Sequence, residues 1–278
     1  MKRLATVLAM TATAALAADL QPSKDAGPYV PSPQSVVADM LRYAEVGAND
    51  FLVDLGSGDG RIVLTAAKVF GARGFGVEIK EELVKRANEA AQQEGLAERV
   101  KFVKQDLFKT DISQATVVTM YLLPDTVNML KDKFMAELRP GTRIVSHDYP
   151  LTGWIPEKYV QMDLEDKVQI SGVTTTLIYL YVVPAKVGGR WEARMPPAIS
   201  KQPASLTLKQ QLTRVSGSLR VDGRDLPLEE VKLRGDHLTF RLAGHKGGFS
   251  GVVRDGAIEG TFESGNNRTP WSAALLRG

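Results

Sequence analysis

Apolar runs alternate with amphipathic stretches through the middle of the chain. Five runs have the length and composition of buried strands: 51–56, 74–79, 100–107, 115–123 and 142–149. Four stretches carry apolar residues at helical spacing: 35–46, 61–71, 81–95 and 125–138. Apolar strands that alternate with helices predict an α/β fold, a doubly wound and mostly parallel sheet with helices on both faces.

The pattern changes after residue 157. Residues 159–164 and 174–183 are rich in β-formers, with no clear helix between them. We expect these two segments to form an antiparallel pair at the edge of the sheet, which would then have seven strands.

Short strand-like pieces alternate with turns from residue 190 onward. The Asp-Gly pairs at 222–223 and 255–256 are typical of tight hairpin turns. We expect a small all-β C-terminal domain over 190–278, after an α/β domain at 35–185 and a proline-rich extended arm at 18–34.

The first residues, 1–17, have the pattern of a signal peptide. Lys2 and Arg3 precede a short apolar stretch, and Ala15-Leu16-Ala17 is typical of a cleavage site. The stretch is too short for a stable membrane span. The sequence therefore predicts an exported, periplasmic protein. The alternative is an uncleaved leader that anchors the chain to a membrane.

Composition limits the chemistry of the chain. Cysteine is absent, which excludes thiolate zinc sites and cysteine nucleophiles, and the three histidines give no reason to expect a metal. The net charge of +3 does not call for nucleic acid. Residues 186–278 hold 15 Lys and Arg against 9 acids, which indicates either a solvated basic surface or a docking face for an envelope partner.

A glycine loop, Gly56-Ser57-Gly58-Asp59-Gly60, follows the first predicted strand. It lacks the lysine of a P-loop, which argues against ATP and GTP. Its spacing departs from the dinucleotide fingerprint, and Asp54 and Asp59 would repel a pyrophosphate by about 1–4 kcal/mol. S-adenosylmethionine carries a sulfonium, an ammonium and no phosphate. It suits this loop better, and we expect Asp54 and Asp59 to lie near its ammonium.

Two further acids follow the next two predicted strands. Glu78 lies 22 residues after Gly56, where an acid can accept both ribose hydroxyls. Asp106 is expected to accept from the adenine amino group, with Leu107 against the base. Because the carboxyl ends of parallel strands share one edge of a sheet, these acids and Asp54 should converge on one pocket.

The segments at 28–33, 54–63 and 76–79, which read PYVPSP, DLGSGDGRIV and GVEI, resemble the class I S-adenosylmethionine-dependent methyltransferases. The similarity is to the branch of the ATP synthase c-subunit lysine methyltransferases and, more distantly, to the histone methyltransferase Dot1. It covers roughly residues 28 to 154. The resemblance implies the seven-stranded methyltransferase fold and an arm that folds over the cofactor. The predicted cofactor site comprises Tyr29, Pro31, Asp54, Gly56, Ser57, Gly58, Asp59, Gly60, Glu78, Asp106 and Leu107.

Candidate catalytic residues follow the fourth and fifth predicted strands. Tyr121 is placed to line an acceptor pocket, and His147 and Asp148 to take a proton or orient the acceptor. The run Tyr121-Leu-Leu-Pro124 lacks the Asp/Asn-Pro-Pro-aromatic motif of enzymes that methylate nucleic acid bases, which argues against DNA or RNA. We expect methylation of protein lysine. The alternatives are an exported nucleoside-binding protein with a non-catalytic methyltransferase fold, and a small-molecule O-methyltransferase.

Overall fold

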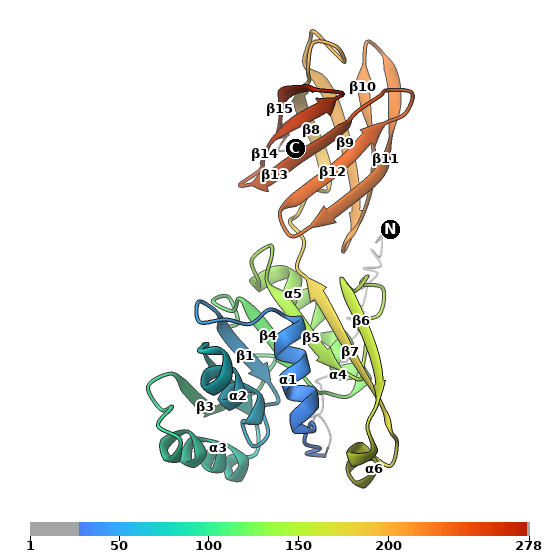
Figure 1. Cartoon of the computed structure of the whole chain (residues 1–278). Helices are drawn as coiled ribbons and strands as arrows, with labels where there is room; N and C mark the ends of the chain where they lie inside the picture. Colours follow the sequence, from blue (N-terminus) through green and yellow to red (C-terminus); the bar gives the residue numbers. More distant parts are fainter. Residues whose placement is uncertain (1–27, 277–278) are drawn as a thin grey trace, which may run out of the picture.

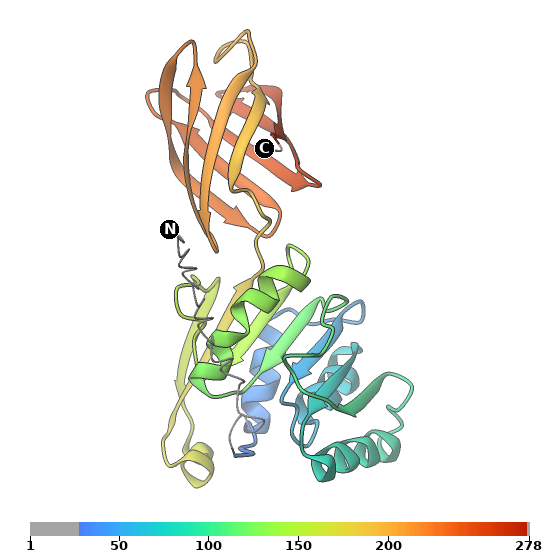
Figure 2. The same cartoon turned by 180° about the vertical axis from the view of Figure 1, so that it is seen from behind.

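Two sheets organise the computed structural model, which describes residues 28–276 (Figure 1). An open sheet with helices on both faces comes first along the chain, and a closed barrel follows it, as the view from behind in Figure 2 also shows. The predicted signal peptide and the first part of the predicted arm lie outside the described residues.

The open sheet has seven strands in the order β3-β2-β1-β4-β5-β7-β6. Neighbours among β1 to β5 are parallel, whereas β7 runs antiparallel to both β5 and β6. The predicted mostly parallel sheet with an antiparallel edge pair is confirmed. Its strands are β1 (Phe51–Leu55), β2 (Arg73–Glu78), β3 (Val100–Lys104), β4 (Val117–Met120), β5 (Arg143–His147), β6 (Lys158–Asp163) and β7 (Thr175–Val182).

Alternate residues of these strands enter two cores. Leu52, Val117 and Val145 pack with α1 (Gln34–Tyr43), α2 (Arg61–Phe70) and α3 (Glu81–Gln93). Their neighbours Val53 and Val118 point to the other face and pack with α4 (Pro124–Met129) and α5 (Lys131–Glu137). The strands are therefore buried on both sides, which is why they are apolar throughout.

Two helical segments differ from the sequence prediction. The helix expected over 125–138 is divided into α4 and α5 because the chain tightens at Leu130, whose N–H bonds Val127 three residues back. A short helix, α6 (Glu165–Ser171), lies between β6 and β7, where no helix was expected. It ends at Gly172, which has a φ of +76°.

The second unit is a closed barrel of eight strands, in which each strand pairs with the next and β15 pairs back with β8. Large side chains fill its interior, among them the buried Trp191, Phe240 and Trp271. The expected all-β C-terminal region is confirmed. Its strands are β8 (Gly189–Arg194), β9 (Ala204–Gln211), β10 (Arg214–Val221), β11 (Arg224–Arg234), β12 (His237–Leu242), β13 (Gly248–Arg254), β14 (Ala257–Ser264) and β15 (Asn267–Leu275).

The barrel meets the open sheet at the edge where the parallel strands begin. The Ala185 N–H donates to the Gly235 carbonyl, and Arg234 pairs with Glu157. Gly235 packs against the backbone of Gly141, just before β5. The carboxyl ends of the parallel strands lie at the opposite edge and are open to the described arm. Over residues 28–276, no helix has both the length and the hydropathy to cross a bilayer.

Candidate active site

The glycine loop turns the chain sharply between β1 and α2. Gly56, Gly58 and Gly60 have φ values of +77°, +54° and +83°, which side chains rarely adopt. The N–H groups of Gly56 and Ser57 donate to the Val77 carbonyl at 2.9 and 2.8 Å, which fixes the loop to β2. The first turn of α2 therefore faces the carboxyl edge of the sheet.

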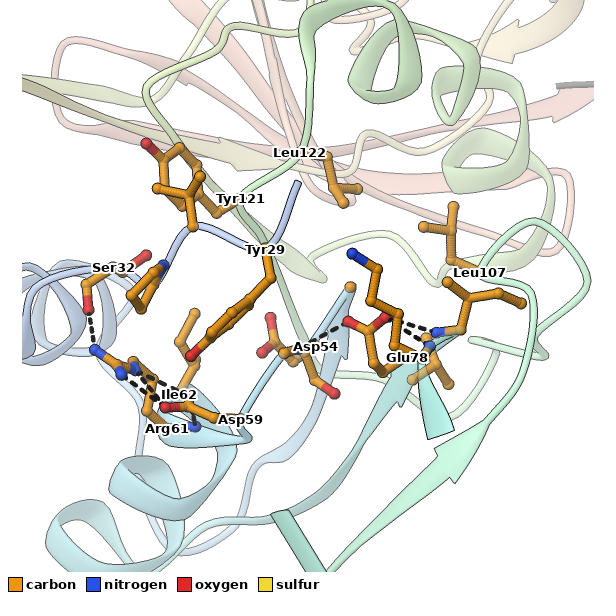
Figure 3. A pocket seen from close by; sticks show the side chains of 18 of the residues that line it. Tyr29, Ser32, Asp54, Asp59, Arg61, Ile62, Glu78, Leu107, Tyr121 and Leu122 are labelled. Carbon is orange, nitrogen blue, oxygen red and sulfur yellow. Dashed lines mark hydrogen bonds and ion pairs between the residues drawn. The ribbon is translucent and has the colours of Figure 1, made fainter. Parts of the chain in front are cut away.

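The three acids predicted to converge do line one pocket. Asp54 and Glu78 are labelled among its lining residues in Figure 3. Asp54 is the penultimate residue of β1, Glu78 ends β2, and Asp106 follows β3, so their positions come from three neighbouring parallel strands. The order of strands reverses at β1, which has β2 on one side and β4 on the other. Ligands bind at this switch point in open α/β sheets.

Asp54 is 2% exposed, and its carboxylate accepts a 2.7 Å hydrogen bond from the Thr119 hydroxyl. Burial raises the pKa of Asp54 to about 7, a rise that Asp59 and Glu78 reinforce and Thr119 opposes. A cation in this pocket would favour the ionised carboxylate. The buried Asp54 is thus better suited to an ammonium than to a phosphate.

Glu78 is held by the backbone. Its Oε1 accepts from the N–H groups of Ile79 and Lys80, and its Oε2 accepts from the Gly58 N–H at 3.1 Å. The carboxylate therefore links the glycine loop to the start of the segment leading into α3. Asp106 is also oriented locally, because its Oδ1 accepts from the Phe108 N–H at 2.9 Å.

Asp59 has a partner that the sequence analysis missed. Arg61, the first residue of α2, donates to both oxygens of its carboxylate, with Nη2 and Oδ2 2.6 Å apart. Burial raises the pKa of Asp59, but the Arg61 bonds and charge outweigh it and hold the pKa below its ordinary value. Arg61 thus neutralises the acid that was expected near an ammonium. The Gly-Asp-Gly-Arg order was the available signal for this pair.

The described part of the arm crosses the pocket. The ring of Tyr29 lies so close to Gly58 that a Cβ there would be 2.5 Å from a ring carbon. Arg61 also donates to the Ser32 carbonyl at 2.8 Å, and the Ser32 hydroxyl bonds Nδ1 of His147 at 2.8 Å. These contacts attach the arm to both α2 and β5.

Tyr121 lies across the pocket from Glu78 and Leu107 (Figure 3). Its hydroxyl donates to Oδ2 of Asp148 at 3.0 Å, and its ring packs on His147 with the centroids 3.9 Å apart. His147 is fully buried, and burial lowers its pKa to about 4, so the ring is neutral near pH 7.

The lining of the pocket includes most of the predicted site. Of the predicted cofactor residues, ten lie in it: Tyr29, Pro31, Asp54, Gly56, Ser57, Gly58, Asp59, Glu78, Asp106 and Leu107. Gly60 does not, and a Cβ on it would meet Phe102 and Ala87, so it serves the packing of α2. Tyr121 lines the pocket, whereas His147 and Asp148 lie behind it.

The residues present fit S-adenosylmethionine. A loop of positive-φ glycines allows close approach of a ligand to the backbone, and Asp54 offers a buried carboxyl group that a cationic ligand would favour in its ionised form. Glu78 and Asp106 stand where ribose and adenine groups would be bound. Among residues 28–276 we find no cluster of His, Cys, Asp or Glu that could hold a metal ion.

Comparisons with known proteins agree with this geometry. The family model of the ANTKMT methyltransferase domain matches residues 54–158. A protein-lysine N-methyltransferase of Saccharolobus islandicus is 43% identical over 157 residues, which cover 56% of this chain and 93% of that protein. The adenine nucleotide translocase lysine N-methyltransferase of Mus musculus is 36% identical over 129 residues, 46% of this chain and 56% of that protein.

A solved structure is similar over more than half of the chain. It is described as an RNA methyltransferase from Salinibacter ruber in complex with S-adenosyl-L-homocysteine. It is 44% identical, covers 57% of this chain and 96% of its own, and superimposes with a TM-score of 0.51.

Proposed function

Because the chain belongs to the class I S-adenosylmethionine-dependent methyltransferases, in the protein-lysine N-methyltransferase branch, we propose that it methylates the side-chain amine of lysine in a protein. The observation that carries the proposal is the pocket of Asp54, Glu78 and Asp106, which faces Tyr121. The names of the relatives support lysine as the acceptor.

The roles of the residues follow from their places in the pocket. The bound cofactor would supply a methyl group on a sulfonium, which becomes a neutral thioether as the amine gains the methyl and then releases a proton. Asp54 would meet the cofactor's ammonium, Glu78 its ribose, and Asp106 and Leu107 its base. The arm at Tyr29 and Pro31 would cover the ligand and exclude water. Tyr121 would contact the acceptor.

The acceptor decides between this proposal and its alternatives. The run Tyr121-Leu-Leu-Pro124 supports a protein amine over a nucleic acid base, although the Salinibacter protein is described as an RNA methyltransferase. The test is transfer of labelled methyl groups from S-adenosylmethionine to separated protein, RNA and small-molecule fractions. Methyl-lysine in protein hydrolysates, absent with the Glu78→Ala variant, is the expected result.

Other outcomes of this assay oppose the proposal in different ways. Label in the RNA fraction would indicate that the methyl acceptor is a nucleic acid base rather than a protein lysine. Label in a hydroxylated small molecule would indicate a small-molecule O-methyltransferase. Binding of S-adenosylmethionine in calorimetry without transfer to any fraction would favour a nucleoside-binding protein that does not catalyse.

We also propose that the protein is exported to the periplasm. Lys2, Arg3 and the run Ala15-Leu16-Ala17 support this, and a retained leader as a membrane anchor is the alternative. Mass spectrometry of the mature native protein tests it: a chain that begins at Ala18 is expected, and one that retains residues 1–17 would contradict it.

An envelope partner for the barrel is part of the same proposal. Residues 186–221 carry seven Lys and Arg with one Glu, whereas residues 222–278 carry eight of each sign. The excess positive charge thus belongs to β8–β10 and the segments that precede and join them, which suits an anionic partner. Binding to anionic vesicles that weakens with salt, and is absent with neutral vesicles, is the expected result.

A further inference from the structure

A buried lysine stands behind the candidate catalytic tyrosine. Lys167 of α6 is 2% exposed, and its Nζ donates to both oxygens of Asp148 at 2.7 Å. It also donates to the Thr175 carbonyl at 2.5 Å. A buried ammonium with good geometry to a carboxylate strongly orders both groups.

Asp148 is fixed from several elements. Its φ of +63° is unusual for a residue with a side chain, and its N–H donates to the Leu177 carbonyl at 2.7 Å. Its Oδ1 accepts from the Leu177 N–H at 3.0 Å. Asp148 is thereby bound to β7 through both its backbone and its side chain. A strained position that is held this firmly is typical of functional sites.

The charge of Asp148 determines how Tyr121 presents its hydroxyl. Burial raises the pKa of Asp148, but interactions with His147 and Lys167 and the Leu177 N–H outweigh it, so the pKa is below its ordinary value. The ionised carboxylate can only accept hydrogen bonds. Tyr121 must therefore donate to it, and the tyrosine oxygen keeps its lone pairs for a ligand in the pocket.

We propose that Lys167 is a positioning residue that acts through Asp148 to hold the Tyr121 oxygen as a hydrogen-bond acceptor for the substrate amine. This inference rests on the proposed lysine methylation. A neutral amine has N–H donors and one lone pair. When the N–H groups are bound by acceptors, the lone pair is directed toward the methyl group. Burial, with the Asp148 charge, also raises the pKa of Tyr121, which keeps it neutral and excludes it as a base.

The proposal gives His147 and Asp148 roles other than proton removal. Nδ1 of His147 is bonded to Ser32, and its ring supports the Tyr121 ring. The low pKa of Asp148 makes it a weak base. The amine would therefore lose its proton to solvent before it enters the pocket, and these residues order the tyrosine that receives it.

Lys167→Met tests the positioning role, with the exposed Lys101→Met on β3 as the matched control. We expect kcat for lysine methylation to fall roughly tenfold to a hundredfold, the effect of one charge-assisted hydrogen bond. The dissociation constant for S-adenosylhomocysteine should change less than about twofold, since the cofactor residues are untouched. Lys167→Arg keeps the cation and should recover most of the rate.

The pH profile separates positioning from a structural role. The ionisable groups facing Asp148 are Tyr121 from β4, His147 from β5, Lys167 from α6 and Tyr179 from β7. Loss of the Lys167 cation raises the pKa of Asp148, so the acid limb of kcat should move to higher pH in Lys167→Met. Lys167→Arg should follow the wild-type profile.

A double-variant cycle provides the decisive comparison. In a Tyr121→Phe background Lys167→Met should lower kcat no further, because the hydroxyl it orders is gone. Additive losses, an unshifted acid limb or a kcat within twofold of wild type would overturn the positioning role. If Lys167→Met does not fold, Asp148→Asn takes its place in the cycle, and the same outcomes support or overturn the positioning role. A wild-type protein that methylates no lysine overturns the proposed function instead.

Discussion

The Arg61 guanidinium joins two parts of the candidate site, because it donates to the Ser32 carbonyl of the arm and pairs with Asp59 of the glycine loop. We expect Arg61→Gln to weaken S-adenosylhomocysteine binding about tenfold, since one charge-assisted hydrogen bond of the arm is lost. Calorimetry measures this, and the exposed Arg86→Gln on α3 is the control. Equal affinities in the two variants would mean that the arm does not close over the ligand.

Glu78 holds the loop and is expected to hold the ribose. Glu78→Gln replaces an oxygen that accepts backbone N–H groups by an amide that cannot accept with both atoms. Affinity for S-adenosylhomocysteine should fall at least about tenfold, while the exposed Glu82→Gln should bind normally. Calorimetry again gives the comparison. A Glu78→Gln protein with wild-type affinity would remove Glu78 from the proposed cofactor site.

The raised pKa of Asp54 makes stability depend on pH. The folded, ligand-free protein keeps a proton on Asp54 up to about pH 7, whereas the unfolded chain loses it near 3.8. The free energy of unfolding should therefore fall as pH rises through this window, by up to about 4 kcal/mol. Asp54→Asn lacks this fall. Thermal melts of both proteins at pH 5.5 and pH 8 measure the difference, and parallel shifts would contradict it.

Asp54 should also link ligand binding to protons. If the ammonium of the cofactor lies beside Asp54, binding favours the ionised carboxylate and releases a proton below about pH 7. Affinity should rise between pH 5.5 and pH 7.5 in the wild type and stay flat in Asp54→Asn. Calorimetry in buffers of different ionisation enthalpy counts the protons. Proton uptake on binding would place the ammonium elsewhere.

A substitution that destabilises the barrel should leave the cofactor site intact. A Cβ on Gly260 would come 1.9 Å from the Ser250 carbonyl and 2.6 Å from Nε1 of Trp271. We expect Gly260→Ala to lower the melting temperature of the barrel, as measured by tryptophan fluorescence. Binding of S-adenosylhomocysteine should be retained. Gly248→Ala, with no atom within 4 Å of its Cβ, is the matched control. Loss of binding in Gly260→Ala would show that the two units unfold together.

Periodicity predicted the open sheet because its strands are buried on both faces and its helices on one. The barrel hairpins were predicted for a local reason. Asp222 and Gly223 both have positive φ, as do Asp255 and Gly256, and these pairs form the tight turns between β10 and β11 and between β13 and β14. Such signals act over two to four residues and can therefore be recognised without knowledge of the tertiary fold.

The parts that sequence reasoning missed depend on contacts between distant residues. Lys167 lies in a segment with no clear helical pattern, and only its approach to Asp148 gives it a role. Ser32 was expected only as part of the extended arm, yet its hydroxyl bonds His147, 115 positions further along the chain. Strand order predicted that Tyr121, His147 and Asp148 lie near the carboxyl edge of the sheet. It does not show which of these side chains faces the pocket.

The closure of the barrel by β8 and β15 brings the beginning and the end of that unit onto adjacent strands, with Trp191 opposite Leu275. Because the ring of backbone hydrogen bonds closes within residues 189–275, and the described chain passes from the open sheet into the ring near Pro184, the barrel leaves no unpaired strand edge in this range to which another strand could add.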